Sequence, residues 1–350
     1  MMKSSYREED VILLLKDITG LVEPQPAMER ERLIQSGKHY CEMLPVEYVP
    51  TERYMEIYRE ALFHYAPPVA RAIERLADKV IAAKGKNVVL VSLARAGIPI
   101  GILLKRCIRR KYGIDPGHYA VSIIRGRGID RNAMNFLLEH YRPQDLLFVD
   151  GWIGKGAISE ELKKAVAAFD GVSAQIAVAA DPANVTDLCG THEDILIPSS
   201  CLNSTVCGLI SRTFLRDDII GEKDYHGAVY YGDLSHADLS YEFIEAIEAA
   251  SGGDWPKEPE AAPGKGLDEV RTIAARFQIS DINLIKPGIG ETTRVLLRRG
   301  PYKILIDERY RDDPSLAHVR RLAEEKAVPV EQYPLVHYKT CGIIRKLADI

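Results

Sequence analysis

Short apolar runs that alternate with helical segments constrain the fold of this chain more than any other feature. The run from Asn87 to Leu93 is continuous, rich in β-branched residues and followed by a glycine turn, which is typical of a buried parallel strand. The same pattern predicts strands at 118–124, 146–149 and 175–180, separated by helices over 99–110, 132–139 and 159–169. Strands that alternate with helices indicate an α/β class with a doubly wound parallel sheet.

Segments of different character flank this region. Before it, apolar residues recur at helical spacing after Pro67-Pro68, namely Val69, Ile73, Leu76 and Val80. We therefore expect a helical N-terminal extension over 1–85 that packs on an α/β domain over 86–248. The Gly/Pro/Ala-rich stretch 249–266 has no period and predicts a linker, so residues 267–350 are expected to form a small C-terminal α/β domain.

Composition excludes several classes of protein. The six cysteines contain no C-x-x-C pair and the nine histidines no H-E-x-x-H spacing, so we expect free thiols and no structural zinc. No stretch reaches the ~18 apolar residues that a transmembrane helix needs, and the N-terminus does not resemble a signal peptide. We expect a soluble, cytoplasmic protein with no membrane partner.

A glycine loop follows the strand at 146–149 and opens a helix. The strand ends at Asp150, and the loop contains Gly154, Lys155 and Gly156. Ligands of open α/β sheets bind at the carboxyl ends of strands, and a helix N-terminus with free N–H groups suits a phosphate. Asp150 can then hold a ribose hydroxyl and Lys155 can face the phosphate. The alternative is an ordinary strand-loop-helix turn whose glycines serve only its geometry.

Two further loops carry arginines after strands. Arg95, Ala96 and Gly97 follow the first strand and precede a helix that begins near Pro99, so this loop is a candidate for pyrophosphate binding. Arg125 and Arg127 alternate with glycines after the next strand, which is typical of a mobile lid whose guanidinium groups bind phosphate. Solvated basic turns are the alternative for both loops.

A dense set of small polar side chains follows Ile195–Ile197, which we expect to be the end of a strand before a glycine-bearing helix. The set is a candidate substrate-binding surface and comprises Ser199, Ser200, Asn203, Ser204 and Thr205. Cys201 lies among them, where a helix start can lower the pKa of a thiol and make it nucleophilic, with His226 or His236 as base. The alternative is a small buried cysteine.

The glycine loop at 150–158 resembles the diphosphoribosyl-binding loop of type I phosphoribosyltransferases. Asp150 matches the first acid and Gly156 the loop glycine, whereas Gly151 stands at the second acid and Lys155 and Ile158 stand at the threonines. The resemblance implies phosphoribosyl diphosphate with Mg²⁺ as ligand, Arg125 and Arg127 closing over it, and an oxocarbenium-like transition state stabilised by charge and positioning. The resemblance does not identify which residues would bind the metal.

Four longer motifs resemble one family over residues ~30–245: SGKHYCEML, IIRGRGID, LFVDGWIGKGAIS and IPSSCLNSTVCGLISRT. This family comprises phosphoribosyltransferase-like proteins found with bacterial tellurite-resistance and stress genes, and it is also labelled cysteine protease StiP. The resemblance implies a transferase that makes a nucleoside-like metabolite. A cysteine protease that uses Cys201 is the second hypothesis, and a non-catalytic ribose-phosphate sensor that binds RNA is the third.

The C-terminal segment 282–346 resembles the pelota-type RNA-binding domain. The resemblance rests on a glycine-led helix start at Gly290, a strand at 303–307, a helix near 316–326 and a last helix that opens at Cys341. It implies RNA contacts by the glycine loop and nearby basic side chains, with Lys286, Gly290, Arg294, Arg298 and Lys339 as candidates. Residues 266–350 carry a net charge of +3 against −7 for the rest, a modest support for RNA. A small domain that only packs or dimerises is the alternative.

Overall fold

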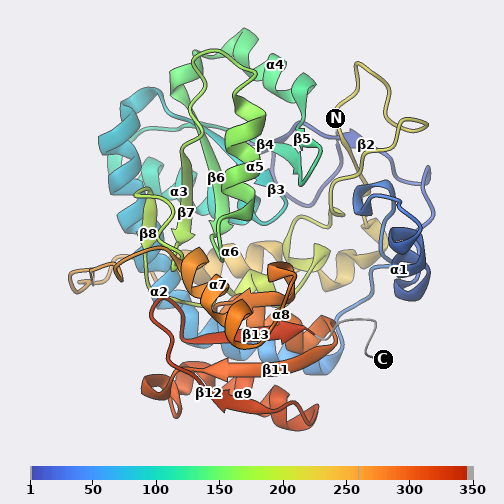
Figure 1. Ribbon diagram of the computed structural model, residues 1–350. Helices are drawn as coiled ribbons and strands as arrows, with labels where there is room; N and C mark the ends of the chain where they lie inside the picture. The colour runs from blue at the N-terminus through green and yellow to red at the C-terminus, as the bar shows by residue number, and fades with distance from the viewer. Residues whose placement is uncertain (1, 259, 345–350) are drawn as a thin grey trace.

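The computed structural model describes residues 2–258 and 260–344, which form a large α/β body and a small C-terminal body beneath it (Figure 1). The main sheet has the order β1-β4-β3-β6-β7-β8, and every neighbouring pair in this order is parallel. Its strands are β1 (Ile12–Leu13), β3 (Val89–Ala94), β4 (Gly117–Ile124), β6 (Leu146–Trp152), β7 (Ile176–Ala180) and β8 (Cys189–Thr191). A short antiparallel strand, β5 (Gly128–Ile129), pairs with β4. This confirms the expected α/β class with a mostly parallel sheet.

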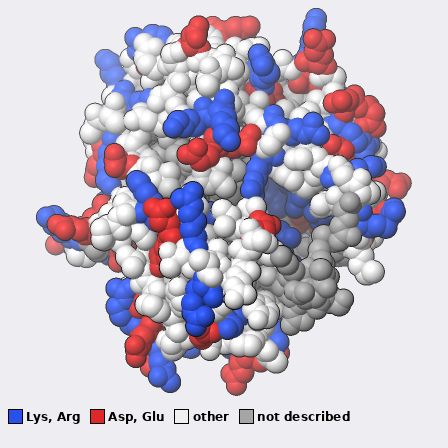
Figure 2. Space-filling model, in the orientation of Figure 1, with Lys and Arg blue, Asp and Glu red and all other residues white. Residues whose placement is uncertain are grey.

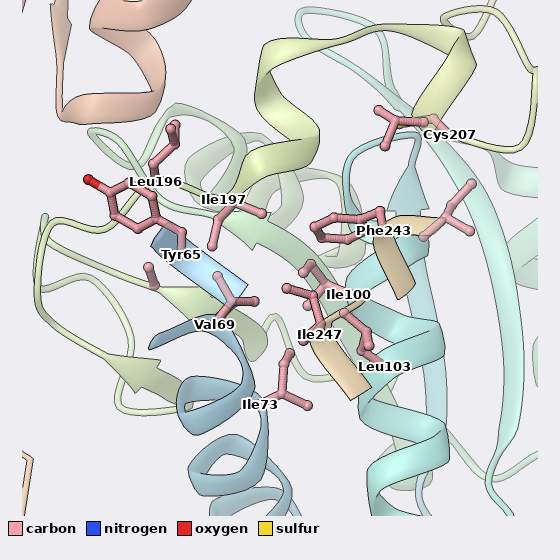
Figure 3. Close-up of a cluster of buried hydrophobic side chains, with 14 of the residues drawn as sticks. Tyr65, Val69, Ile73, Ile100, Leu103, Leu196, Ile197, Cys207, Phe243 and Ile247 are labelled. Atoms are coloured by element: carbon pink, nitrogen blue, oxygen red, sulfur yellow. The ribbon is translucent and has the colours of Figure 1, made fainter. Parts of the chain in front are cut away.

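Helices cover both faces of this sheet. One face carries α2 (Glu52–Lys84), α3 (Gly97–Tyr112) and α6 (Ser240–Ala249), whose apolar side chains interlock in the core shown in Figure 3. The other face carries α4 (Arg131–His140) and α5 (Ala157–Val166). The strands are buried on both faces, which explains why β3 and β6 are continuous apolar runs. The remaining elements of the large body are α1 (Ala27–Gln35) and the paired strands β2 (Lys16–Asp17) and β9 (Gly227–Ala228).

The small C-terminal body has a four-stranded sheet with the order β10-β13-β11-β12. Its strands are β10 (Ile285–Pro287), β11 (Pro301–Ile306), β12 (Val330–Gln332) and β13 (Thr340–Ile344). Its helices are α7 (Gly266–Arg276), α8 (Ile289–Arg298) and α9 (Ala317–Glu325). The helix start expected at Cys341 is wrong, because Cys341 lies in the buried central strand β13; the rest of that helix, from residue 345, lies outside the described residues. A short apolar run that is buried on all sides does not separate strand from helix by its pattern.

The N-terminal segment differs from the helical extension expected over 1–85. Residues Ile12 and Leu13 form β1 and extend the main sheet by pairing with Tyr119 and Ala120. Helix α2 also begins before Pro67-Pro68 rather than after them. Prolines at these positions remove the hydrogen bonds to the carbonyl groups of Phe63 and His64. Both residues are exposed, so water can bind these carbonyls and the helix continues.

The segment after Ile195–Ile197 is also irregular where a strand end and a helix were expected. Residues Pro198–Cys201 and Ser204–Val206 form two short 3-10 helices, here called η4 and η5. Gly208 and Leu209 have φ angles of 69° and 56°, and this left-handed backbone stops a right-handed helix. The predicted glycine-bearing helix is therefore wrong, and the polar set lies in a compact loop between α2 and α8.

Candidate functional site

A cavity of about 360 Å³ opens where the carboxyl ends of β3, β4 and β6 meet the small C-terminal body. We call it the interdomain cavity. Strands β3 and β6 are parallel neighbours, so the loops that follow them emerge at one edge of the sheet. Five basic side chains and two acidic ones line it: Arg95, Arg125, Lys155, Lys286, Arg294, Asp150 and Glu291. The lining is therefore strongly positive, as a site for a phosphorylated ligand requires.

Asp150 lies at the end of β6 and faces the cavity. Its carboxylate accepts a hydrogen bond of 2.8 Å from the Gly151 amide. Burial nevertheless raises the pKa of this carboxyl to about 7, because no cation of the described residues lies close enough to offset the loss of water. A Cβ added at Gly151 would lie 3.3 Å from the carbonyl oxygen of Ala96, which is a tight contact. The loop after β3 therefore leaves little space for a second acidic side chain at this position.

The loop after β6 brings the two bodies together. Gly156 has a φ of 90° and starts α5, as the sequence predicts for a helix that begins in a glycine loop. The Lys155 ammonium donates to the backbone oxygens of Ile282 (2.6 Å) and Ile285 (3.3 Å) in the small body. Burial first, and then Lys286 and Arg125, lower the pKa of Lys155 to about 8. The Gly154 carbonyl accepts a hydrogen bond of 2.7 Å from Tyr338.

The loop after β3 also lies at the cavity, and its Ala94–Arg95 peptide bond is cis. The Arg95 guanidinium donates to the Ile210 carbonyl at 2.8 Å and to Asn203 Oδ1 at 3.3 Å. It also lies 3.7 Å from the buried Glu47 carboxylate. Gly97 packs against β6, because an added Cβ would lie 2.3 Å from the Val149 carbonyl oxygen. Arg95 is thus positioned at the wall of the cavity by fixed partners.

The two arginines of the expected lid are placed differently. Arg125 lines the cavity and donates to Asn283 in the small body at 3.0 Å, whereas Arg127 forms an ion pair of 3.0 Å with Glu42 and does not line the cavity. The amides of Gly126 and Gly128 both donate to Glu161 on α5. The loop is therefore fastened at both ends, in contrast to the mobile lid that its glycines suggested.

The small polar set packs inside the contact between the two bodies rather than around the cavity. Asn203 accepts hydrogen bonds from both Arg95 and Arg298, and Ser204 donates to Glu47. Ser199, Ser200 and Thr205 are buried, and η4 packs against α8. Asn203 thus positions both arginines, and Ser204 contributes through Glu47, which lies beside Arg95. Their sequence pattern showed a cluster but not whether a ligand or the C-terminal body would cover it.

Cys201 has the surroundings of a core residue. Its side chain is fully buried, and burial raises the pKa of its thiol to about 12. His226 instead contacts Ser122 through Nδ1 at 2.8 Å, and His236 is exposed, so neither makes a hydrogen bond to Cys201. The exposed, acidic thiol expected of a nucleophile is not what the structure has at this position.

Two cysteine–histidine contacts occur elsewhere in the described chain. His39 Nδ1 lies 2.9 Å from Cys41 Sγ, and His192 Nε2 lies 3.3 Å from Cys189 Sγ. All six thiols are buried. The first pair adjoins the cavity, because the neighbouring Tyr40 hydroxyl accepts a hydrogen bond from the Arg125 amide. The motif SGKHYCEML contains this pair, and the spacing of two between His39 and Cys41 was the signal that could have found it.

The candidate RNA-binding residues point mainly toward the large body. Lys286 and Arg294 line the cavity, and Arg298 donates to Asn203 and to the Cys201 carbonyl. Gly290 is buried beside Ser200, and the α8 N-terminus donates through Ile289 to Asp194. Lys339 lies elsewhere, over the Tyr310 ring and 4.0 Å from Asp313. The glycine-led helix start is therefore occupied by a protein carboxylate.

The comparisons with known proteins agree with two parts of this architecture. Residues 4–248 match the family described as tellurite-like stress resistance cysteine protease StiP, and residues 264–346 match the PELOTA RNA-binding domain. This chain belongs to the StiP family and carries a C-terminal PELOTA domain, which confirms the resemblances drawn from its motifs. A curated relative, "Cysteine protease StiP" of Acinetobacter baylyi, is 35% identical over 365 aligned positions, covering 98% of this chain and 94% of the relative.

Similar solved structures are distant. A hypoxanthine-guanine phosphoribosyltransferase of Bacillus anthracis has a TM-score of 0.26 and 13% identity over 35% of this chain and 71% of its own. A hypothetical protein of Neisseria gonorrhoeae with bound ppGpp has a TM-score of 0.22 and 19% identity over 32% and 65%. We draw no conclusion from likenesses of this size. The family description agrees with the cysteine protease hypothesis rather than with the transferase. In the described residues, no helix is long and apolar enough to cross a membrane.

Proposed function

We propose that this member of the StiP stress-resistance family binds a phosphorylated ribose ligand in the interdomain cavity. The observation that carries the proposal is the gathering of five basic side chains against two acids at the carboxyl ends of parallel strands. One of these acids, Glu291, already pairs with Arg294 at 3.0 Å. The start of α5 would hold the 5′-phosphate through its N–H groups, with Lys155 beside it. Asp150 would bind the ribose hydroxyls.

Phosphoribosyl diphosphate fits this arrangement as a transferase substrate. An acceptor would form a bond to the ribose C1 carbon as the bond to diphosphate breaks, and diphosphate would leave with the electron pair. Arg125 and Lys286 would face the departing charge. The described chain has no group of three acidic, histidine or cysteine residues for a metal, so Mg²⁺ would be held mainly by diphosphate oxygens with Asp150 as the protein carboxylate.

Calorimetric titration with phosphoribosyl diphosphate and Mg²⁺ tests this proposal. We expect binding by the wild type and a loss of about 10- to 100-fold in affinity in Asp150→Asn and Lys155→Ala, the size expected for a charged hydrogen bond. Lys163→Ala is the matched control, because Lys163 lies exposed on the same helix α5. Wild-type protein that binds neither this compound nor a nucleoside monophosphate would overturn the proposal.

A cysteine hydrolase is the second candidate, because the family description names a cysteine protease. The Cys41–His39 contact of 2.9 Å is the arrangement that a thiol nucleophile and its base require. Burial raises the pKa of the Cys41 thiol, while Arg127 acts in the opposite direction. Catalysis by this pair therefore requires the segment 36–42 to move and admit water and substrate.

Thiol alkylation separates the two cysteines. If the hydrolase hypothesis is right, iodoacetamide should modify Cys41 faster than Cys201, and Cys41→Ser should abolish hydrolysis of a casein substrate. Cys201→Ser should keep the activity, because Cys201 lacks the histidine contact that Cys41 has and burial raises the pKa of its thiol to about 12. Mass spectrometry of the labelled peptides gives the rates. Equal labelling only after unfolding, with no hydrolysis by the wild type, would remove this candidate.

A further inference from the structure

Positive charge continues beyond the interdomain cavity along the contact between the two bodies. Arg298 and Arg299 follow Arg294 at the end of α8, and Arg212 lies two residues beyond Ile210, whose carbonyl holds Arg95. We call Arg212 and Arg299 the outer arginines. Figure 2 shows Lys and Arg atoms in the depth of the hollow between the two bodies. A ligand that fills only the cavity would not contact the outer arginines, because neither of them lines it.

The partners of Arg212 indicate that its guanidinium is available. The guanidinium has no hydrogen bond or ion pair with residues 2–258 or 260–344, although Arg212 is half-buried, and it lies 5.9 Å from the centre of the Tyr40 ring. Burial, and then the like charges of Arg30, Arg95 and Arg299, lower its pKa to about 10. These like charges favour the binding of an anion beside the Arg212 guanidinium.

The outer arginines are also linked electrostatically to the cavity itself. The pKa of Lys286 is lowered, first by burial and then by the charges of Arg299, Arg294 and Arg125. Glu291 acts in the opposite direction. Tyr40 connects Arg212 to the cavity, because its ring lies 5.9 Å from the Arg212 guanidinium and its hydroxyl accepts a hydrogen bond from the amide of Arg125. Positive charge therefore extends from the cavity to Arg212, and an extended basic surface of this kind suits a chain of phosphates better than a single compact anion.

We infer that the ligand of the interdomain cavity is the 5′-phosphorylated end of a single-stranded RNA whose following phosphates lie along the outer arginines. This inference rests on the proposed function, because the terminal nucleotide supplies the phosphorylated ribose. Its 5′-phosphate meets the start of α5 and Lys155, and its 2′-hydroxyl meets Asp150. Tyr40, beside Arg212, offers a ring on which a base can stack. The PELOTA domain then binds RNA through the face that closes the cavity, not through an outer face.

Fluorescence anisotropy with a 12-nucleotide oligouridylate tests the inference, with the label at the 3′ end and either a phosphate or a hydroxyl at the 5′ end. We expect the 5′-phosphorylated RNA to bind at least tenfold more tightly. Arg212→Gln and Arg299→Gln should each weaken RNA binding about tenfold and reduce the slope of log affinity against log salt by about 0.7. Both should bind phosphoribosyl diphosphate within twofold of wild type, because the outer arginines do not line the cavity.

Two controls keep the test decisive. Arg212→Lys retains the charge and should recover most RNA binding, and Lys339→Gln removes a basic residue of the same body that lies away from the cavity. RNA binding that is lost in Lys339→Gln but kept in the outer-arginine variants would place RNA on an outer face and overturn the inference. Binding of phosphoribosyl diphosphate without RNA binding would overturn it while leaving the proposed function intact. Failure of both ligands would overturn both.

Discussion

Asp150 combines a carboxyl group with surroundings that disfavour its charge. Burial raises its pKa from the ordinary 3.8 to about 7, although its carboxylate accepts a hydrogen bond from the Gly151 amide. A raised pKa means that the folded protein binds a proton more tightly than the unfolded chain between these two values. The stabilising contribution is therefore complete below about pH 4 and is lost as the pH rises through 7. Perturbed carboxyl groups of this kind are typical of functional sites.

Asp150→Asn should consequently stabilise the protein at high pH. The amide keeps the hydrogen bond to Gly151 and carries no charge, so we expect the free energy of unfolding at pH 8 to rise by on the order of 1–3 kcal/mol relative to wild type. At pH 4 the two proteins should differ by less than about 0.5 kcal/mol. Urea unfolding at both pH values measures this. Asp170→Asn, at an exposed position, is the control, and an equal effect in both variants would contradict the assignment.

At the scale of elements, the sequence predicted the parts of the fold that are buried on both sides and bounded by glycine. Strands β3, β4, β6 and β7 and helices α3, α4 and α5 follow from continuous apolar runs and glycine turns. Strand β1 escaped prediction because two residues carry no periodicity, and their pairing partner in β4 lies more than 100 positions away. Strand β13 was mistaken for a helix because a short buried apolar run fits both structures.

The same reasoning explains which part of the site could be predicted. Asp150, Lys155, Arg95 and Arg125 lie at the carboxyl ends of strands that the sequence assigns to one parallel sheet, so their meeting at one sheet edge follows from that assignment. The contribution of the C-terminal body did not follow, because it depends on how this body packs against elements that are remote in the sequence. Arg127 and the small polar set were predicted to bind ligand because their protein partners could not be foreseen. Glu42, which pairs with Arg127, and α8, which packs on the polar set, both come from remote segments of the chain.

At the scale of the whole molecule, hydrogen bonds from several elements join the two bodies. Asp194 of the large body accepts hydrogen bonds from the amides of Ile289 (3.0 Å) and Lys339 (2.9 Å) in the small body. Helix α2 contributes Tyr54 and Tyr65, whose hydroxyls donate to the carbonyls of Leu297 and Ser315. The small body is thus docked in one orientation, and this orientation places Lys286 and Arg294 against the loop after β6.

Ligand binding should therefore order both bodies together. When phosphoribosyl diphosphate and Mg²⁺ are added, we expect amide hydrogen exchange to slow in the loop and first turn of α5 and also in β10 and the first turn of α8, because Lys155 and Lys286 would contact the same ligand. Helix α4 lies away from the cavity and should exchange at an unchanged rate. Hydrogen exchange followed by mass spectrometry resolves these segments. Protection confined to α5 would show that the large body binds the ligand alone and that the C-terminal body is only docked beside it.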